Sequence, residues 1–159
     1  MLELSGSEIQ PRASRRAVLR AAGALAAGAG LLPGPAAATP EATRKLITDL
    51  AGGAALKEGR IKLDLPQVAD NGATVPVSVK VDSPMTAQDH VRALYVLAEH
   101  NPIPETAIFR FTPACGEAEV SLRMRLAKTQ TVYALAQMSD GSAYLAKGEV
   151  KVTVGGCGT

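Results

Sequence analysis

The sequence predicts an all-β domain, an antiparallel β-sandwich, with one short helix before it. Apolar and polar residues alternate with a period of two in several segments after residue 60, which is typical of strands with one buried face. Turn-forming residues separate these segments, and many short strands with little helix indicate a sandwich. The 159 residues suffice for one such domain, and no internal repeat is visible.

The helix is expected at residues 41–51. Thr39 can accept a hydrogen bond from the first turn, and Pro40 suits a first helical position, where no backbone N–H is needed. Apolar residues then recur at helical spacing, and the pair Gly52-Gly53 ends the pattern.

Seven segments are expected to form strands. In VPVSVKVD the valines at positions 75, 77, 79 and 81 lie on one face, and Ser78, Lys80 and Asp82 lie on the other. The other segments are IKLDL (61–65), VRALYVLAE (91–99), TAIFRF (106–111), EVSLRMRLA (119–127), TVYALAQMS (131–139) and GEVKVTV (148–154). Turns are expected at DNG (70–72), SP (83–84), NP (101–102) and DGS (140–142).

Residues 1–38 are expected to be a twin-arginine export signal. Arg15 and Arg16 precede a moderately apolar run at 21–32, which at about 12 residues is too short to span a bilayer. The run AAA at 36–38 offers a cleavage site. An ordinary secretory signal and an amphipathic anchor are the alternatives. The predicted organisation is a cleaved signal at 1–38, a sandwich domain at 39–154 and a tail at 155–159, located in the periplasm and not held in a membrane.

The domain after this signal is expected to be close to neutral. Four of the 17 basic residues and two of the 15 acidic residues lie before residue 39, which leaves 13 of each. A neutral domain has no electrostatic attraction for nucleic acid. The five aromatic residues, none of them tryptophan, also make a large stacking platform unlikely to form.

The sequence shows no motif of an ordinary enzyme or cofactor site. His90 and His100 have no cysteine or acid at the spacing of metal ligands, and each is interpreted as a polar residue near a strand end. No C-x-x-C redox pair, haem-attachment motif, nucleophile elbow or phosphate-binding loop is present. Neither a metal nor another cofactor is therefore expected.

Two cysteines remain, and their interpretation is open. Cys115 lies in TPACGEAE, between two expected strands, and Cys157 lies in the terminal GGCGT. An exported protein can join two cysteines in a disulfide, and a tail cysteine can also be incidental. A third hypothesis is a carrier arm, in which Gly155, Gly156 and Gly158 form a slender, flexible support and the Cys157 thiol holds cargo as a nucleophile.

The tail GGCGT resembles the terminal Gly-Gly-Cys-Gly-Gly of the SoxY family, the sulfur-carrier subunits of the bacterial thiosulfate-oxidising (Sox) system. The segments NGATVPVSVKVDSPM (71–85) and NPIPETAIFRFTPACGEAEVSLRMRLAKTQTVYALAQMSDGS (101–142) are also similar to that family, as is the twin-arginine leader. The resemblance extends over essentially the whole expected mature chain.

This resemblance implies an immunoglobulin-like sandwich that forms a heterodimer with a second sandwich subunit, SoxZ. It also implies that the protein is not an enzyme but carries sulfur covalently on Cys157, without a cofactor of its own. Thiosulfate would be joined to this cysteine by a c-type cytochrome, and a hydrolase would release sulfate. In many organisms a sulfane dehydrogenase would then oxidise the remaining sulfur.

The chain departs from the family pattern in two ways. Thr159 stands where the family has a final glycine, and Cys115 is a second thiol that the carrier mechanism does not require. The competing hypotheses are a periplasmic binding or adhesion sandwich, whose tail cysteine is incidental or disulfide-bonded, and a thiol-dependent enzyme. The second is disfavoured because no general base or resolving-cysteine motif is visible.

Overall fold

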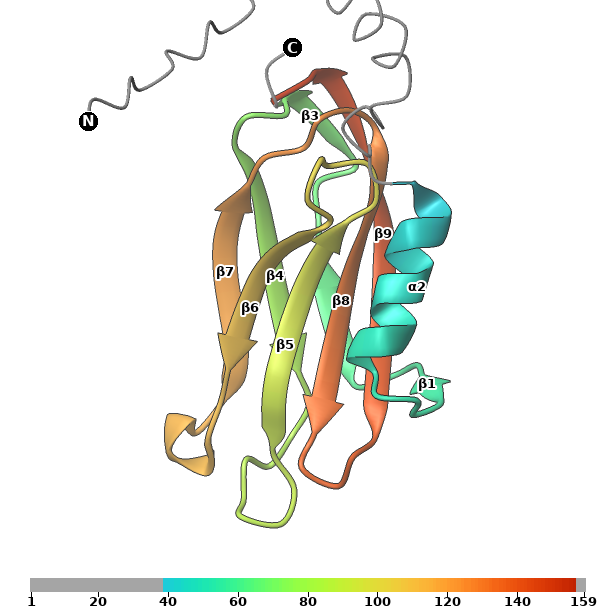
Figure 1. Cartoon of the computed structure of the whole chain (residues 1–159). Coiled ribbons are helices and arrows are strands. Elements are labelled where there is room, and N and C mark those ends of the chain that lie inside the picture. The colour runs from blue at the N-terminus through green and yellow to red at the C-terminus, as the bar shows by residue number, and fades with distance from the viewer. Residues whose placement is uncertain (1–38, 157–159) are drawn as a thin grey trace, which may run out of the picture. The chain divides into compact units, whose positions relative to one another are not determined.

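A computed structural model describes residues 39–156 of the chain. Within this range one α-helix, α2 (Pro40–Leu50), packs beside two β-sheets, and a short 3₁₀ helix, η2 (Pro113–Cys115), connects two of the strands (Figure 1). The expected export signal, with Arg15 and Arg16, and residues 157–159 lie outside the described residues.

The larger sheet is built around β9. This strand pairs antiparallel with β8, and the antiparallel order continues through β5 to β6, whereas β1 and β3 pair with β9 in parallel. The strands of this sheet are β1 (Leu56–Lys57), β3 (Val68–Asn71), β5 (Val91–Ala98), β6 (Glu105–Arg110), β8 (Gln130–Met138) and β9 (Ala143–Val154).

The smaller sheet faces the larger one and is antiparallel throughout, in the order β2-β4-β7. The valines of β4 point into the space between the sheets and are at most 2% exposed, while Pro76 and Lys80 on the same strand face outward. This confirms the period-two interpretation of the segment. The strands of this sheet are β2 (Ile61–Asp64), β4 (Val75–Val81) and β7 (Ala118–Met124).

Helix α2 begins and ends close to the predicted positions. Thr39 Oγ1 accepts a hydrogen bond from Ala42 N at 3.2 Å, which caps the first turn. After the helix, Gly52 and Gly53 have φ angles of 64° and 80°, a left-handed conformation that favours glycine. These local signals explain why the helix could be located from the sequence.

A second apolar layer forms where α2 packs on the outer face of the larger sheet (Figure 1). Ile47 of the helix is buried against Tyr95 and Leu97 of β5 and Tyr133 and Leu135 of β8. Both β5 and β8 are therefore buried on two faces, because the sandwich core covers one face and the helix covers the other.

The structure confirms the immunoglobulin-like sandwich class and adds details that the pattern did not predict. The short strands β1 and β3 were not expected, and β9 begins at Ala143 rather than at residue 148. Neither β1 nor β3 shows a buried alternating face, so each forms because it lies along β9 and completes its hydrogen bonds there. Among the described residues, no helix has the length and apolar character needed to cross a membrane.

Candidate functional site

The end of β9 places the start of the C-terminal tail at one end of the sandwich (Figure 1). β9 ends at Val154, whose side chain is 61% exposed, and Gly155 and Gly156 are the last residues that the structure describes. Cys157 and Gly158 lie outside the described range. The attachment of sulfur to Cys157 and the flexibility of the arm therefore stay predictions.

Three segments that are distant in sequence meet at the start of the tail. Gly72 N donates a hydrogen bond to Val154 O at 2.7 Å, and Leu126 N donates to Gly72 O at 2.8 Å. Gly156 N in turn donates to Leu126 O at 2.9 Å. The first residues of the tail are thus bonded to the domain. We call this meeting point of Gly72, Leu126 and Gly156 the tail junction.

The glycines at the tail junction lie too close to neighbouring backbone to carry a side chain. A Cβ atom on Gly155 would collide with Ala127 O, and one on Gly156 would collide with the carbonyl group of Gly72. A Cβ atom on Gly72 would lie 2.8 Å from Gly156 N. Gly155 and Gly156 therefore allow close packing against the domain, a role that the hypothesis of a slender arm did not include.

Cys115, the second thiol, lies far from the tail junction. It is exposed on η2, where Thr112 Oγ1 is 3.8 Å from its Sγ atom. η2 precedes β7 and Leu126 follows it, and the seven residues of β7 span about 20 Å. A disulfide needs Cα atoms within about 7 Å, and Cys157 directly follows Gly156. This geometry argues against a disulfide between Cys115 and Cys157 of one molecule.

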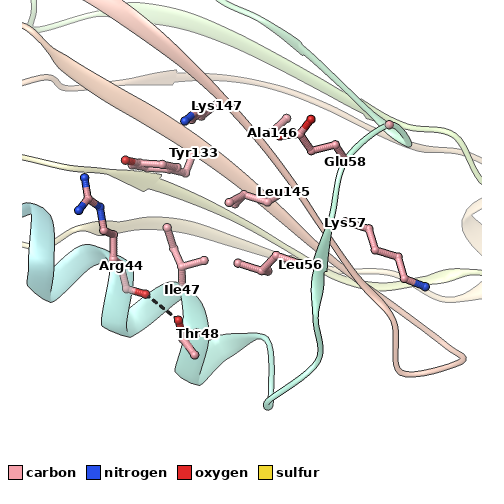
Figure 2. Close-up of a pocket in the computed structure, with 11 residues that line it drawn as sticks. Arg44, Ile47, Thr48, Leu56, Lys57, Glu58, Tyr133, Leu145, Ala146 and Lys147 are labelled. Atoms are coloured by element: carbon pink, nitrogen blue, oxygen red, sulfur yellow. Dashed lines mark hydrogen bonds between the residues drawn. The ribbon is translucent and has the colours of Figure 1, made fainter.

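A surface pocket of about 590 Å³ lies beside α2, between β1 and the strands β8 and β9 (Figure 2). On its wall, Tyr133 Oη donates a hydrogen bond to Glu99 Oε1 at 3.1 Å. Burial, together with the Glu99 carboxylate, raises the pKa of Tyr133 above its ordinary value. The lining combines the apolar side chains of Ile47, Leu56 and Leu145 with the cationic side chains of Arg44, Lys57 and Lys147.

This pocket cannot receive a small group held on Cys157 of the same molecule. Lys147, which lines the pocket, is nine residues from Gly156 along the extended β9, a separation of about 30 Å. Cys157 is only one residue beyond Gly156.

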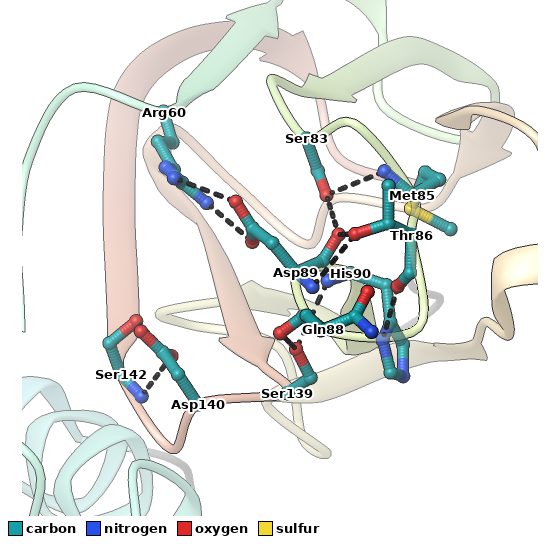
Figure 3. A network of polar contacts seen from close by, with 10 residues as sticks. All are labelled: Arg60, Ser83, Met85, Thr86, Gln88, Asp89, His90, Ser139, Asp140 and Ser142. Carbon is teal, nitrogen blue, oxygen red and sulfur yellow. Dashed lines mark hydrogen bonds and ion pairs between the residues drawn. The ribbon is translucent and has the colours of Figure 1, made fainter.

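A polar network ties together the loops at the end of the sandwich opposite the tail junction (Figure 3). Arg60 donates to the two carboxylate oxygens of Asp89 at 3.0 and 3.1 Å, and this hydrogen bonding raises the pKa of Arg60. His90 N donates to Ser139 Oγ at 3.1 Å. These contacts join the start of β2, the β4–β5 loop and the β8–β9 turn, so they serve the fold.

Both histidines lie near strand ends, as predicted. His90 directly precedes β5, and His100 follows it. In the part of the chain from residue 39 to residue 156, no three His, Cys, Asp or Glu side chains are grouped so that they could hold a metal ion.

Sequence reasoning missed the residues that build the tail junction. Gly72 and Asn101 were identified only as turn residues, and Gln130 was not identified at all. In the structure, Gly72, Asn101 and Gln130 are all buried. The turn motifs DNG and NP were the available signals, but a turn motif does not show which distant segment will pack against it.

Residues 47–157 match the family described as "Sulfur oxidation protein SoxY". The solved structure of the sulfur carrier protein SoxY from Chlorobium limicola f thiosulfatophilum is 34% identical, with a TM-score of 0.59, and the alignment covers 70% of this chain and 96% of that chain. A comparison with curated proteins found no significant match.

More distant structures share the fold alone. A superoxide reductase (neelaredoxin) from Ignicoccus hospitalis is 24% identical, with a TM-score of 0.52 over 59% of this chain and 80% of that chain. A putative superoxide reductase from Thermotoga maritima is 18% identical, with a TM-score of 0.52 over 61% of this chain and 93% of that chain. Because the SoxY family model matches more than half of the sequence and a solved SoxY shares 34% identity, this chain belongs to the SoxY family of sulfur oxidation proteins.

Proposed function

We propose that this protein is a periplasmic sulfur carrier, loaded covalently on Cys157 during thiosulfate oxidation. The observation that carries the proposal is the family match, which runs to residue 157 and so includes the tail cysteine. The related solved structure is that of a sulfur carrier protein. The twin arginine at Arg15 and Arg16 supports export to the periplasm.

Loading is a two-electron oxidation. The Cys157 thiolate and the outer sulfur of thiosulfate form a new S–S bond, which gives a cysteine S-thiosulfonate, and the two electrons pass to a c-type cytochrome partner. A hydrolase then adds water and releases the terminal sulfonate as sulfate, which leaves a persulfide on the cysteine. A sulfane dehydrogenase, where the organism has one, oxidises this remaining sulfur. The sulfur-loaded protein is the substrate of each enzyme in turn, and it catalyses none of these steps.

The tail junction supports this role because it holds the start of the tail at one end of the sandwich, where Gly156 N donates to Leu126 O. Gly156 is the last residue that the structure describes, and Cys157 follows it directly in the sequence. The thiol has a pKa near 8.5 in an unperturbed cysteine, so a fraction is thiolate at neutral pH.

The intact mass of the protein tests the loading directly. We expect protein isolated from the periplasm of cells oxidising thiosulfate to carry sulfur-containing adducts that a reductant such as dithiothreitol removes. Peptide mapping should place them on Cys157, with protein from cells grown without reduced sulfur as the control. An unmodified tail under both conditions would favour the alternative function, a periplasmic binding or adhesion sandwich.

We also propose that the protein pairs with a second sandwich subunit, SoxZ-like, along the edge formed by β6. Among the described strands, β6 pairs only with β5, so one side of its backbone has no strand partner and is available for docking. Ile108 on this strand is 44% exposed, and Ile103 in the preceding loop is 73% exposed. Exposed apolar side chains beside an open strand edge are typical of a docking surface.

Ile108→Lys is expected to weaken the heterodimer at least tenfold in dissociation constant, because a charge would have to be buried at the interface. Val68→Lys is the matched control, since Val68 is a 56% exposed aliphatic residue on β3. Size-exclusion chromatography with light scattering on the co-expressed subunits measures the effect. Dissociation by Val68→Lys but not by Ile108→Lys would place the interface elsewhere.

A further inference from the structure

We propose that Asn101 is a positioning residue for the carrier cysteine. Together with Gln130 it orients the connection between β7 and β8, which holds the start of the tail and so determines where Cys157 leaves the domain. This inference rests on the proposed carrier function.

The side chain of Asn101 bonds the backbone on both sides of Leu126. Its Nδ2 atom donates to Arg125 O at 2.8 Å, and its Oδ1 atom accepts from Ala127 N at 3.0 Å. These two bonds orient the peptide groups before and after Leu126. Leu126 is the residue whose own N and O atoms bond Gly72 and Gly156.

Gln130 holds the Asn101 amide in this orientation. Gln130 Nε2 donates to Asn101 Oδ1 at 3.0 Å, and Gln130 Oε1 accepts from His100 N at 2.7 Å. Asn101 is 6% exposed and Gln130 is 3% exposed. A buried amide pair with all these partners is rigid, because any rotation would leave a buried polar group unsatisfied.

The Thr129 hydroxyl adds a second tie between the same connection and the tail strand. Its Oγ1 atom accepts a hydrogen bond from Val152 N at 2.9 Å. Asn101, oriented by Gln130, therefore fixes the β7–β8 connection. This connection in turn bonds the end of β9 through Thr129 and the start of the tail through Leu126. The exit point of the tail is set by this chain of contacts and not by β9 alone.

Anchoring Gly155 and Gly156 to the domain reduces the backbone conformational entropy that is lost when a partner enzyme binds the tail. Fixing the backbone of one residue changes a binding equilibrium by about five- to thirtyfold. Loss of the Asn101 bonds should release these two glycines. The KM of the conjugating enzyme for this protein should then rise by about fivefold or more, while kcat stays close to its original value.

Asn101→Ala and Gly156→Ala test the inference at the first and last residues of the series of contacts Asn101–Leu126–Gly156. Asn101→Ala removes the support of Leu126, whereas Gly156→Ala places a Cβ atom against the Gly72 carbonyl group and displaces the tail directly. Ser139→Ala is the control, because the Ser139 hydroxyl accepts from His90 N and donates to Gln88 O at the end of the sandwich opposite the tail junction.

Two readouts decide the outcome in the purified protein. First, NMR amide exchange should show that Gly156 N–H loses its protection in Asn101→Ala and keeps it in Ser139→Ala. Second, the KM increases of Asn101→Ala and Gly156→Ala should not add in the double variant, since both act through one contact. Unchanged Gly156 exchange in a folded Asn101→Ala protein, or fully additive effects on KM, would overturn the proposal.

The exchange measurement needs neither thiosulfate nor a partner enzyme. If the wild-type protein is never loaded on Cys157, the carrier function fails. The exchange of the Gly156 amide still decides whether Asn101 positions the tail.

Discussion

Cys157→Ser is expected to abolish loading with thiosulfate-derived sulfur, whereas Cys115→Ser is expected to load at close to the wild-type rate. A serine hydroxyl cannot form the S–S bond that holds the cargo, so the first variant should lose essentially all loading. Cys115 is exposed, but it lies at the end of β7 away from the tail junction. We therefore expect that a partner enzyme bound to the tail makes no use of it.

Intact-mass analysis after incubation with thiosulfate and the conjugating enzyme measures both variants under the same conditions. Cys115→Ser is the control for the general effect of a cysteine replacement. Loading that survives Cys157→Ser and is lost in Cys115→Ser would contradict the assignment of Cys157. Loss in both variants would indicate that the two thiols work together, through a contact between molecules, since the geometry opposes their pairing within one.

Gly72→Ala is expected to have the second largest effect, on both stability and loading. The added Cβ atom would collide with Leu126 O and would lie 2.8 Å from both Gly156 N and a methyl group of Val152. These neighbours include backbone atoms of two different segments, which cannot move aside independently. We expect the free energy of unfolding to fall by about 1–3 kcal/mol and the tail junction to open.

Gly148→Ala is the matched control for this substitution. A Cβ atom on Gly148 would meet only the end of the Leu65 side chain, which can rotate away. Urea unfolding curves give the change in stability, and the loading assay gives the change in function. Equal losses of unfolding free energy in the two variants would contradict the prediction that the close backbone contacts of Gly72 are required for stability.

The strands with one buried face could be predicted from the sequence because their signal is local. In β4 the valines alternate with Ser78 and Lys80, and a strand with this alternation can bury only its valine face. The start of α2 could also be predicted from the sequence, because Thr39 caps a helical turn that begins at the next residue. The assignment of sulfur attachment to Cys157 rests on the resemblance of GGCGT to the SoxY tail and stays a prediction.

The second buried face of β5 and β8 could not be predicted in this way. Alternation places Tyr133 and Leu135 on the face of β8 opposite Val132 and Ala134, yet both are buried beneath α2. Nothing in the local pattern shows where a helix that ends at Leu50, well before both strands in the chain, will pack. The same reason applies to β1, whose hydrogen bonds exist only because β9 lies beside it.

The sequence by itself determined the sandwich class and the capped helix, because each depends on residues close together in the chain. Only the tertiary structure showed that Gly155 and Gly156 pack against Ala127 and Gly72, and that Cys115 lies at the other end of β7. Only the tertiary structure also joined Asn101 to the backbone around Leu126. These contacts link segments that are distant in sequence, and their partners are selected by the packing of the two sheets, which no local pattern encodes.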